Sequence, residues 1–295
     1  MSSGTATTAS RTLTLRDGRS LGYAEYGDPH GKPVFLCHGT PGCRLQVHPN
    51  ESIVTALGVR LIVADRPGYG LSTFQPRRRL LDWPDDVAQL ADALGIERFA
   101  VIGWSGGGSH TAACVYKMPQ RLTRACLIAA AAPLDIPRAT QGMAVINRSA
   151  AIIGRYVPFF VQRALSTWEA RGRRHYPEKL FDQLMPQLPA VDRAALTQTA
   201  FRRMLDASVA EAYRQGGRGH AWESRLFAQP WGFRLQDIAV EVHLWHGEED
   251  TLVPPGLGRY LAGAIPGCVA TFLPGEGHFT VYEKCWRDIL SAAVA

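Results

Sequence analysis

The chain is organised around residues 103–107, Gly-Trp-Ser-Gly-Gly, which follow an apolar run at 99–102 and precede a helix-compatible run at 109–116. A G-x-S-x-G pattern between a strand and a helix is typical of a sharp turn that exposes the serine hydroxyl. Glycines suit such a turn because the backbone is strained and the helix must pack close to the strand. Taken alone, the pentapeptide also fits an ordinary tight connection. Its context in the rest of the chain decides between the two interpretations.

Length and composition predict one sizeable globular domain. The 295 residues are 46% hydrophobic and 20% charged, which is enough to bury a large core. The net charge of +6 comes from 32 basic and 26 acidic residues spread through the chain. No aromatic RNA-binding signature or zinc-ligand spacing accompanies the arginines, so nucleic acid is not an expected partner. The six cysteines form no C-x-x-C motif, and we interpret them as free thiols.

The first ten residues do not resemble a secretory signal. Residues 1–10 are mostly Ser, Thr, Ala and Gly and lack an apolar core, which predicts a disordered leader and not a secretory signal. No window of the sequence is long and apolar enough for a membrane span. We therefore expect a cytoplasmic protein without a membrane partner.

The order of apolar runs predicts the α/β class, with a mostly parallel sheet covered by helices on both faces. A period-two hairpin pattern occupies 11–26. Further strands are expected at 33–37, 61–64, 99–102, 123–131, 240–246 and 269–273, with helices at 44–58, 85–95, 257–264 and from Thr280 onwards.

The alternation of strands and helices stops between about 137 and 230, where the sequence is helical, rich in arginine and aromatic residues, and divided by prolines. This interruption predicts an inserted helical cap at 136–231. Residues 11–135 and 232–295 then form the core domain.

Two polar clusters follow later strands. Asp250 comes after the strand expected at 240–246, and His278 comes after the strand expected at 269–273. The carboxyl ends of parallel strands share one edge of a sheet, so Ser105, Asp250 and His278 are expected to converge there. Their order along the chain is nucleophile, acid, histidine. Asp135, after the strand expected at 123–131, is the alternative acid.

These residues resemble those of the α/β-hydrolase superfamily. The resemblance covers about residues 12–293 and is to the branch in which a helical cap follows the sixth strand. The matching motifs are His38-Gly39-Thr40-Pro41-Gly42, Asp65-Arg66-Pro67-Gly68-Tyr69-Gly70, Gly103 to Gly107, His246-Gly247 with Asp250, and Gly277-His278. The resemblance implies the α/β-hydrolase fold, with a nucleophile elbow at Ser105.

The resemblance also implies a role for each motif residue. Ser105 would be the nucleophile, His278 the base, and Asp250 the group that orients the imidazole. The backbone N–H groups of Thr40 and Gly106 would form the oxyanion hole. No metal or organic cofactor is implied.

Other residues of the motifs have plainer roles. Trp104 and Phe279 are expected beside the substrate. His38 is expected to hold its loop, His110 to be buried against a strand, and Asp65 with Arg66 to brace a turn.

The nucleophile narrows the choice of reaction. Haloalkane dehalogenases and epoxide hydrolases of this fold use aspartate where this chain has Ser105. Proline iminopeptidases typically carry tryptophan at the position of Gly106, which disfavours the peptidase interpretation. Their cap supplies carboxylates for a free amino terminus, and the acidic residues available here match no motif. They are Glu169, Glu178, Glu211 and Glu223.

We therefore predict a serine carboxylic-ester hydrolase, a carboxylesterase, that acts on a small or medium, largely apolar substrate. The alternatives are a proline iminopeptidase-like enzyme, a carbon–carbon bond hydrolase and a non-catalytic ligand receptor with the same fold. The expected partner is a small molecule, and a homo-oligomer is left open.

Overall fold

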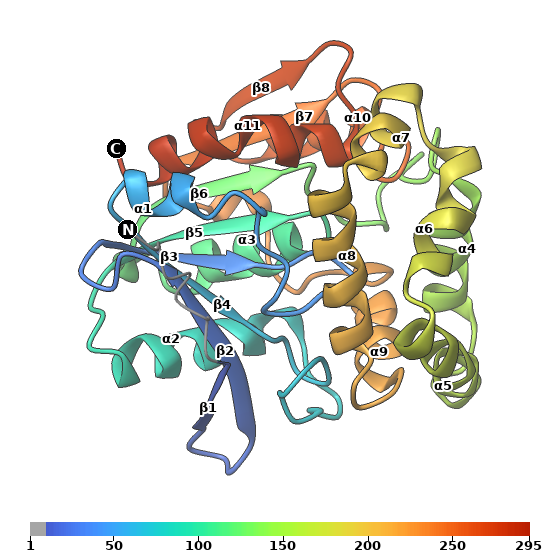
Figure 1. The fold of residues 1–295 in the computed structure, drawn as a ribbon, viewed down its shortest axis with the longest axis horizontal. Helices are drawn as coiled ribbons and strands as arrows, with labels where there is room; N and C mark the ends of the chain where they lie inside the picture. Colours follow the sequence, from blue (N-terminus) through green and yellow to red (C-terminus); the bar gives the residue numbers. More distant parts are fainter. Residues whose placement is uncertain (1–9) are drawn as a thin grey trace.

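A computed structural model describes residues 10–295, so residues 1–9 of the predicted leader lie outside the described part. Eight strands form one sheet in the order β1-β2-β4-β3-β5-β6-β7-β8, shown in Figure 1. β2 is antiparallel to β1 and to β4, and the strands from β4 to β8 are parallel to one another. The predicted α/β sheet and its amino-terminal hairpin are confirmed. The strands are β1 (Arg11–Thr14), β2 (Ser20–Gly27), β3 (Lys32–Cys37), β4 (Val59–Ala64), β5 (Phe99–Trp104), β6 (Leu122–Ile128), β7 (Val242–Gly247) and β8 (Val269–Leu273).

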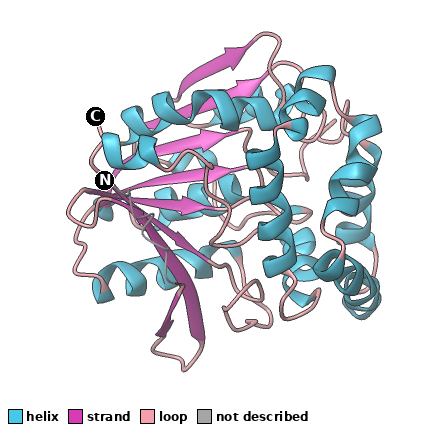
Figure 2. Cartoon of the chain, in the orientation of Figure 1, coloured by secondary structure: helices cyan, strands magenta, loops and turns pink. Residues whose placement is uncertain are grey.

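Helices cover both faces of the sheet, as Figure 2 shows. α1 and α11 belong to one apolar cluster with one face of the sheet, and α2, α3 and α10 belong to a second cluster with the other face. Every residue of β5 is buried, as expected for a central strand with helices above and below it. These helices are α1 (Ser52–Ala56), α2 (Trp83–Ala93), α3 (Gly107–Lys117), α10 (Pro255–Ala264) and α11 (His278–Ala293).

Two predicted elements are shorter than expected. The helix predicted at 44–58 is reduced to α1, because Pro49 disfavours a helix and the Asp65 carboxylate holds Arg44 in a loop at 2.6 Å from its backbone N. The strand predicted at 123–131 ends with β6 at Ile128. Ala129 has a positive φ of 42°, and the chain there turns to contact the Ser105 turn.

A run of helices separates β6 from β7. They are α4 (Val145–Tyr156), α5 (Phe159–His175), α6 (Glu178–Leu184), α7 (Ala190–Thr197), α8 (Thr199–Ala212) and α9 (Arg218–Phe227). Figure 1 shows them beside the carboxyl ends of the parallel strands, where the Ser105 turn lies. We call them the inserted helices and propose that they form the cap predicted at 136–231. None of the helices in residues 10–295 combines the length and apolarity that a bilayer crossing needs.

Candidate active site

Ser105 lies on a tight turn between β5 and α3. Its φ of 55° is in the left-handed region, which costs free energy for a residue with a side chain. Two hydrogen bonds hold the turn: the Ser105 N–H donates to the Ile128 carbonyl and the Ala131 N–H donates to the Ser105 carbonyl, both at 2.9 Å. A Cβ on Gly107 would collide with the Cys37 carbonyl, so only glycine allows this approach. The turn has the predicted form of a nucleophile elbow.

His278 and Asp250 form a buried pair. His278 Nδ1 lies 2.7 Å from Asp250 Oδ2, and the two residues are 3% and 2% exposed. The other oxygen of Asp250 accepts the N–H groups of Leu252 and Val253 at 2.8 Å each, which fixes the carboxylate. Asp135, the alternative acid, is exposed. The structure therefore places Asp250, and not Asp135, beside the histidine.

The pKa of His278 is raised above its ordinary value. Burial alone would lower it, but the charge of Asp250, the hydrogen bond to Asp250 and the charge of Asp192 together outweigh burial. A raised pKa makes the imidazole a stronger base. Such a pair can accept a proton and hold it as an imidazolium.

Ser105 and His278 line the same cavity, of about 410 Å³. Trp104 and Phe279, the predicted substrate-contacting residues, line it as well. The Trp104 ring stacks on Tyr282 with centroids 4.3 Å apart and is only 2% exposed. The structure thus brings these four predicted site residues to one cavity.

Two backbone donors lie beside Ser105. Thr40 and Gly106 line a second, smaller cavity that also touches Ser105. Within residues 10–295, neither N–H group donates a hydrogen bond. Gly106 also precedes α3, whose amino terminus favours negative charge. The arrangement suits an oxyanion. A Cβ on Gly106 would come within 2.9 Å of both Thr40 Cβ and Phe227 Cζ, so a tryptophan at this position requires these neighbours to move.

Asp192 on α7 is a site residue that the sequence analysis missed. Its Oδ2 accepts the N–H of His278 at 2.8 Å, and its Oδ1 accepts those of Phe279 at 2.9 Å and Thr280 at 3.1 Å. The first N–H groups of a helix have no partner within the helix, and Asp192 satisfies three of them. Because of this cap, α11 begins at His278 and not at Thr280 as predicted. The sequence around Asp192 contains no motif that would indicate its contact with α11.

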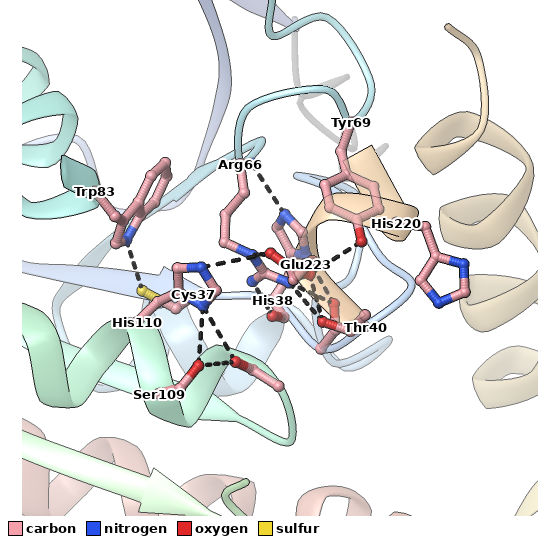
Figure 3. A network of polar contacts seen from close by, with 12 residues as sticks. Cys37, His38, Thr40, Arg66, Tyr69, Trp83, Ser109, His110, His220 and Glu223 are labelled. Carbon is pink, nitrogen blue, oxygen red and sulfur yellow. Dashed lines mark hydrogen bonds and ion pairs between the residues drawn. The ribbon is translucent and has the colours of Figure 1, made fainter. Parts of the chain in front are cut away.

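Glu223 on α9 was also not recognised as part of the site. Its fully buried carboxylate accepts Arg66 Nε at 2.7 Å and the Thr40 hydroxyl at 2.6 Å. Tyr69 OH at 2.9 Å and Arg78 Nη2 at 3.1 Å also contact this carboxylate. Figure 3 shows Glu223 with Arg66, Tyr69 and Thr40. Burial alone would raise the pKa of Glu223, but the charges around it, chiefly Arg66, hold it well below its usual range.

This cluster fixes the loop that carries one of the two donors. Arg66 Nη2 donates to the Gly39 carbonyl at 3.1 Å and to the Thr40 hydroxyl at 2.8 Å. The loop is therefore held both by Arg66, which follows β4, and by Glu223 of α9.

The remaining motif residues have the structural roles that we expected. His38 is buried, with its Nδ1 2.8 Å from the Gly39 carbonyl and its Nε2 accepting the Arg66 N–H at 3.2 Å. His110 is buried as expected, but its recorded neighbours are not on a strand: its Nδ1 lies 3.2 Å from the Gly106 carbonyl and its Nε2 lies 3.4 Å from Glu223 Oε1. Asp65 braces its turn through Arg44 and the Leu71 N–H.

In residues 10–295 all six cysteines are free, and no three acidic, histidine or cysteine side chains are grouped to hold a metal ion.

A mostly parallel sheet with a serine on the turn after β5, and a histidine–aspartate pair after later strands, defines the α/β-hydrolase class. The chain belongs to this family: the family model described as the alpha/beta hydrolase fold matches residues 32–284. This confirms the fold and the family that the sequence motifs predict.

Relatives within the family differ in activity. A non-heme chloroperoxidase of Streptomyces lividans is 31% identical over 44% of this chain and 48% of its own length. A proline iminopeptidase of Xylella fastidiosa is 26% identical over 72% of this chain and 59% of its own length. The chain thus spans about half of these curated relatives. A solved structure of a thermophilic esterase from Thermogutta terrifontis superposes with a TM-score of 0.68 at 22% identity and covers 96% of each chain. That likeness supports the fold alone.

Proposed function

We propose that the protein is a serine hydrolase that cleaves a carboxylic ester of a small or medium, largely apolar substrate through an acyl-enzyme. One observation carries the proposal. Ser105 of the elbow lines the same cavity as His278, whose Nδ1 lies 2.7 Å from Oδ2 of the buried Asp250.

The proposed mechanism follows from these positions. His278 takes the proton of the Ser105 hydroxyl as the oxygen attacks the ester carbonyl, and Asp250 stabilises the imidazolium. The N–H groups of Thr40 and Gly106 bind the oxyanion, and each such donor lowers the barrier by about 3 kcal/mol. The imidazolium then gives its proton to the departing alcohol. Water repeats the sequence and releases the acid.

An aminopeptidase is the second candidate, because one cap carboxylate does face the cavity. Glu169 lines the 410 Å³ cavity, whereas Glu211 pairs with Arg44 and Glu223 is committed to Arg66. A carboxylate there suits an amine. Two observations favour the esterase. A larger side chain at Gly106, where proline iminopeptidases typically carry tryptophan, would collide with its neighbours. The smaller cavity beside Ser105 has no acidic lining residue that could bind a substrate amine.

A hydrolysis panel at neutral pH tests the proposal. p-Nitrophenyl esters of increasing acyl length are compared with proline β-naphthylamide, for the wild type and for Ser105→Ala. We expect ester turnover that falls by about 10⁶ in the variant, because triad residues act as a unit. A preference for the proline amide would support the aminopeptidase. Ester turnover that survives in the variant contradicts the mechanism. If no substrate is hydrolysed, carbon–carbon bond cleavage and ligand binding without catalysis become the next hypotheses to test.

A further inference from the structure

Ser105 stands between two cavities of unequal size. The larger has a volume of about 410 Å³ and the smaller about 110 Å³. They share six lining residues, which are Thr40, Ser105, Asn147, Ala150, His220 and Leu252. Their remaining walls differ in one decisive respect. His278 lines only the larger cavity, and Gly106 lines only the smaller one.

This asymmetry fixes which half of an ester enters which cavity, provided that the proposed function holds. In the breakdown of the tetrahedral intermediate, the imidazolium of His278 protonates the oxygen of the leaving alcohol. That oxygen must therefore lie on the side of His278, and the alcohol extends into the larger cavity. The carbonyl oxygen faces Thr40 and Gly106. We propose that the acyl chain, the substituent that remains, occupies the smaller cavity.

The walls of the smaller cavity define the acyl group. They are contributed by Ala131, Leu134, Met143, Ala151, Phe227, Val253 and Leu257, with Asn147, Ser224 and His220 as polar members. No Asp, Glu, Lys or Arg side chain lines it. A cavity of this kind binds a short, uncharged acyl group, since apolar walls favour apolar atoms and penalise an unpaired charge.

The larger cavity defines the alcohol. Leu180, Phe181, Leu184 and Leu205 give it apolar walls. Glu169 and His220 add a polar corner, in which Glu169 Oε2 lies 3.8 Å from His220 Nδ1. Arg173 donates to the other oxygen of Glu169 at 3.2 Å, which leaves Oε2 open as an acceptor. The protein is thus specific for a short acyl ester of a bulky, mainly apolar alcohol that carries one hydrogen-bond donor.

The same assignment separates the esterase from an aminopeptidase. An aminopeptidase attacks the carbonyl of the amino-terminal residue, so the amine belongs to the acyl half of its substrate. Its carboxylate must then face the acyl cavity. Here Glu169 lines the cavity assigned to the leaving group.

Two ester series test the assignment. In the first, p-nitrophenol is kept and the acyl group grows from acetyl through butyryl to octanoyl. In the second, acetyl is kept and the primary alcohol grows from ethyl to 2-naphthylmethyl, so that the leaving groups stay similar in reactivity, and acid release is followed in a pH-stat. We expect kcat/KM to fall by at least about tenfold from acetyl to octanoyl. Growth of the alcohol should not lower it.

A matched pair of variants assigns each preference to a cavity. Phe227→Ala enlarges the smaller cavity and should raise the octanoyl-to-acetyl ratio of kcat/KM by about tenfold without changing the order of alcohols. Phe181→Ala enlarges the larger cavity and should leave the acyl ratio unchanged. Ala151→Leu, which fills the smaller cavity, should lower the butyryl-to-acetyl ratio and replaces Phe227→Ala if that variant does not fold.

The outcomes separate the two proposals. If the wild type prefers octanoyl, or if Phe181→Ala and not Phe227→Ala changes the acyl ratio, the acyl chain lies in the larger cavity and the assignment is wrong. If no ester is hydrolysed in a way that depends on Ser105, the proposed function itself is wrong.

Discussion

At the scale of single residues, the carboxylate of Asp192 reaches from α7 to the start of α11 and accepts three N–H groups around His278. Its charge is among the causes of the raised pKa of His278, after burial, which acts in the opposite direction, and Asp250. We infer that Asp192 is a positioning residue, because it acts on substrate only through the histidine.

Replacing Asp192 by Asn removes this charge and keeps the shape of the side chain. In the proposed mechanism His278 is the general base and works in its neutral form, so kcat/KM is expected to fall as the pH drops through the pKa of His278. The variant should lower that pKa and move the acid limb of the kcat/KM profile to lower pH. Asp182→Asn, whose exposed carboxylate pairs with Arg202, is the control and should keep the wild-type limb. An unchanged limb in Asp192→Asn would show that Asp192 only holds the helix.

Glu223 is a second buried charge, and we expect its loss to lower the free energy of unfolding. Its carboxylate neutralises Arg66, and both side chains are fully buried. Glu223→Gln leaves the arginine charge uncompensated, which costs about 3–5 kcal/mol of unfolding free energy. Urea unfolding measures the change. Glu241→Gln on the surface, next to Arg124, should leave the midpoint unchanged, and an equal midpoint for Glu223→Gln would refute the importance of the cluster.

At the scale of elements, α3 packs so closely against the sheet that Gly107 touches the end of β3. A Cβ at this position would overlap the Cys37 carbonyl. Gly107→Ala should therefore force α3 away from the sheet, with little soluble protein or a strongly lowered Tm. Gly172→Ala is a matched control within α5, where a Cβ meets no atom within 4 Å. There we expect a gain of about 0.5–1 kcal/mol, from helix propensity. Equal behaviour of the two variants would contradict the close packing.

The elements that were predictable from sequence are those with a local signal. Apolar runs identified the parallel strands, and glycine with histidine at their ends identified the turns of Ser105 and His278. The limits of α1, β6 and α11 were not predictable. They depend on contacts between distant segments, such as Asp65 with Arg44, the Ala131 N–H with Ser105, and Asp192 with α11.

The part of the site that is hardest to predict from sequence lies on the inserted helices. Asp192 and Glu223 have no motif around them, since each acts on a loop far away in sequence. The cavity walls pose the same problem: Phe181 and Phe227 look like ordinary apolar positions of amphipathic helices, and only the fold assigns them to different cavities.

At the scale of the whole molecule, buried histidines dominate the response to acid. The pKa values of His38, His48, His110 and His246 are lowered from 6.5, in each case first because burial disfavours the charged ring. Below pH 6.5 the unfolded chain binds these protons and the native state does not, so stability decreases as the pH falls. His278, with its raised pKa, acts in the opposite direction.

Among the histidines, four lowered pKa values against one raised value predict a Tm that is highest near neutral pH and decreases as the pH falls from about 6.5 to 5. Below that range Asp65, Asp86 and Asp192, whose pKa values are raised by burial, act in the opposite direction. Glu223, with its pKa well below 4.5, adds a further loss once the unfolded chain protonates this group. Differential scanning fluorimetry between pH 8 and pH 4 measures the curve. A Tm that rises between pH 6.5 and pH 5 would contradict the burial of these rings.

Ser105 is the proposed nucleophile, and covalent labelling is the sharpest test of this role. Diethyl p-nitrophenyl phosphate reacts with a serine that a neighbouring histidine activates, releases p-nitrophenol and leaves a diethylphosphoryl group on the oxygen. Intact-protein and peptide mass spectrometry should find one adduct per chain, on Ser105. The adduct should be absent in Ser105→Ala and should form much more slowly in a His278→Ala variant. An unlabelled wild-type protein, or equal labelling of Ser105→Ala, would show that Ser105 is not the nucleophile.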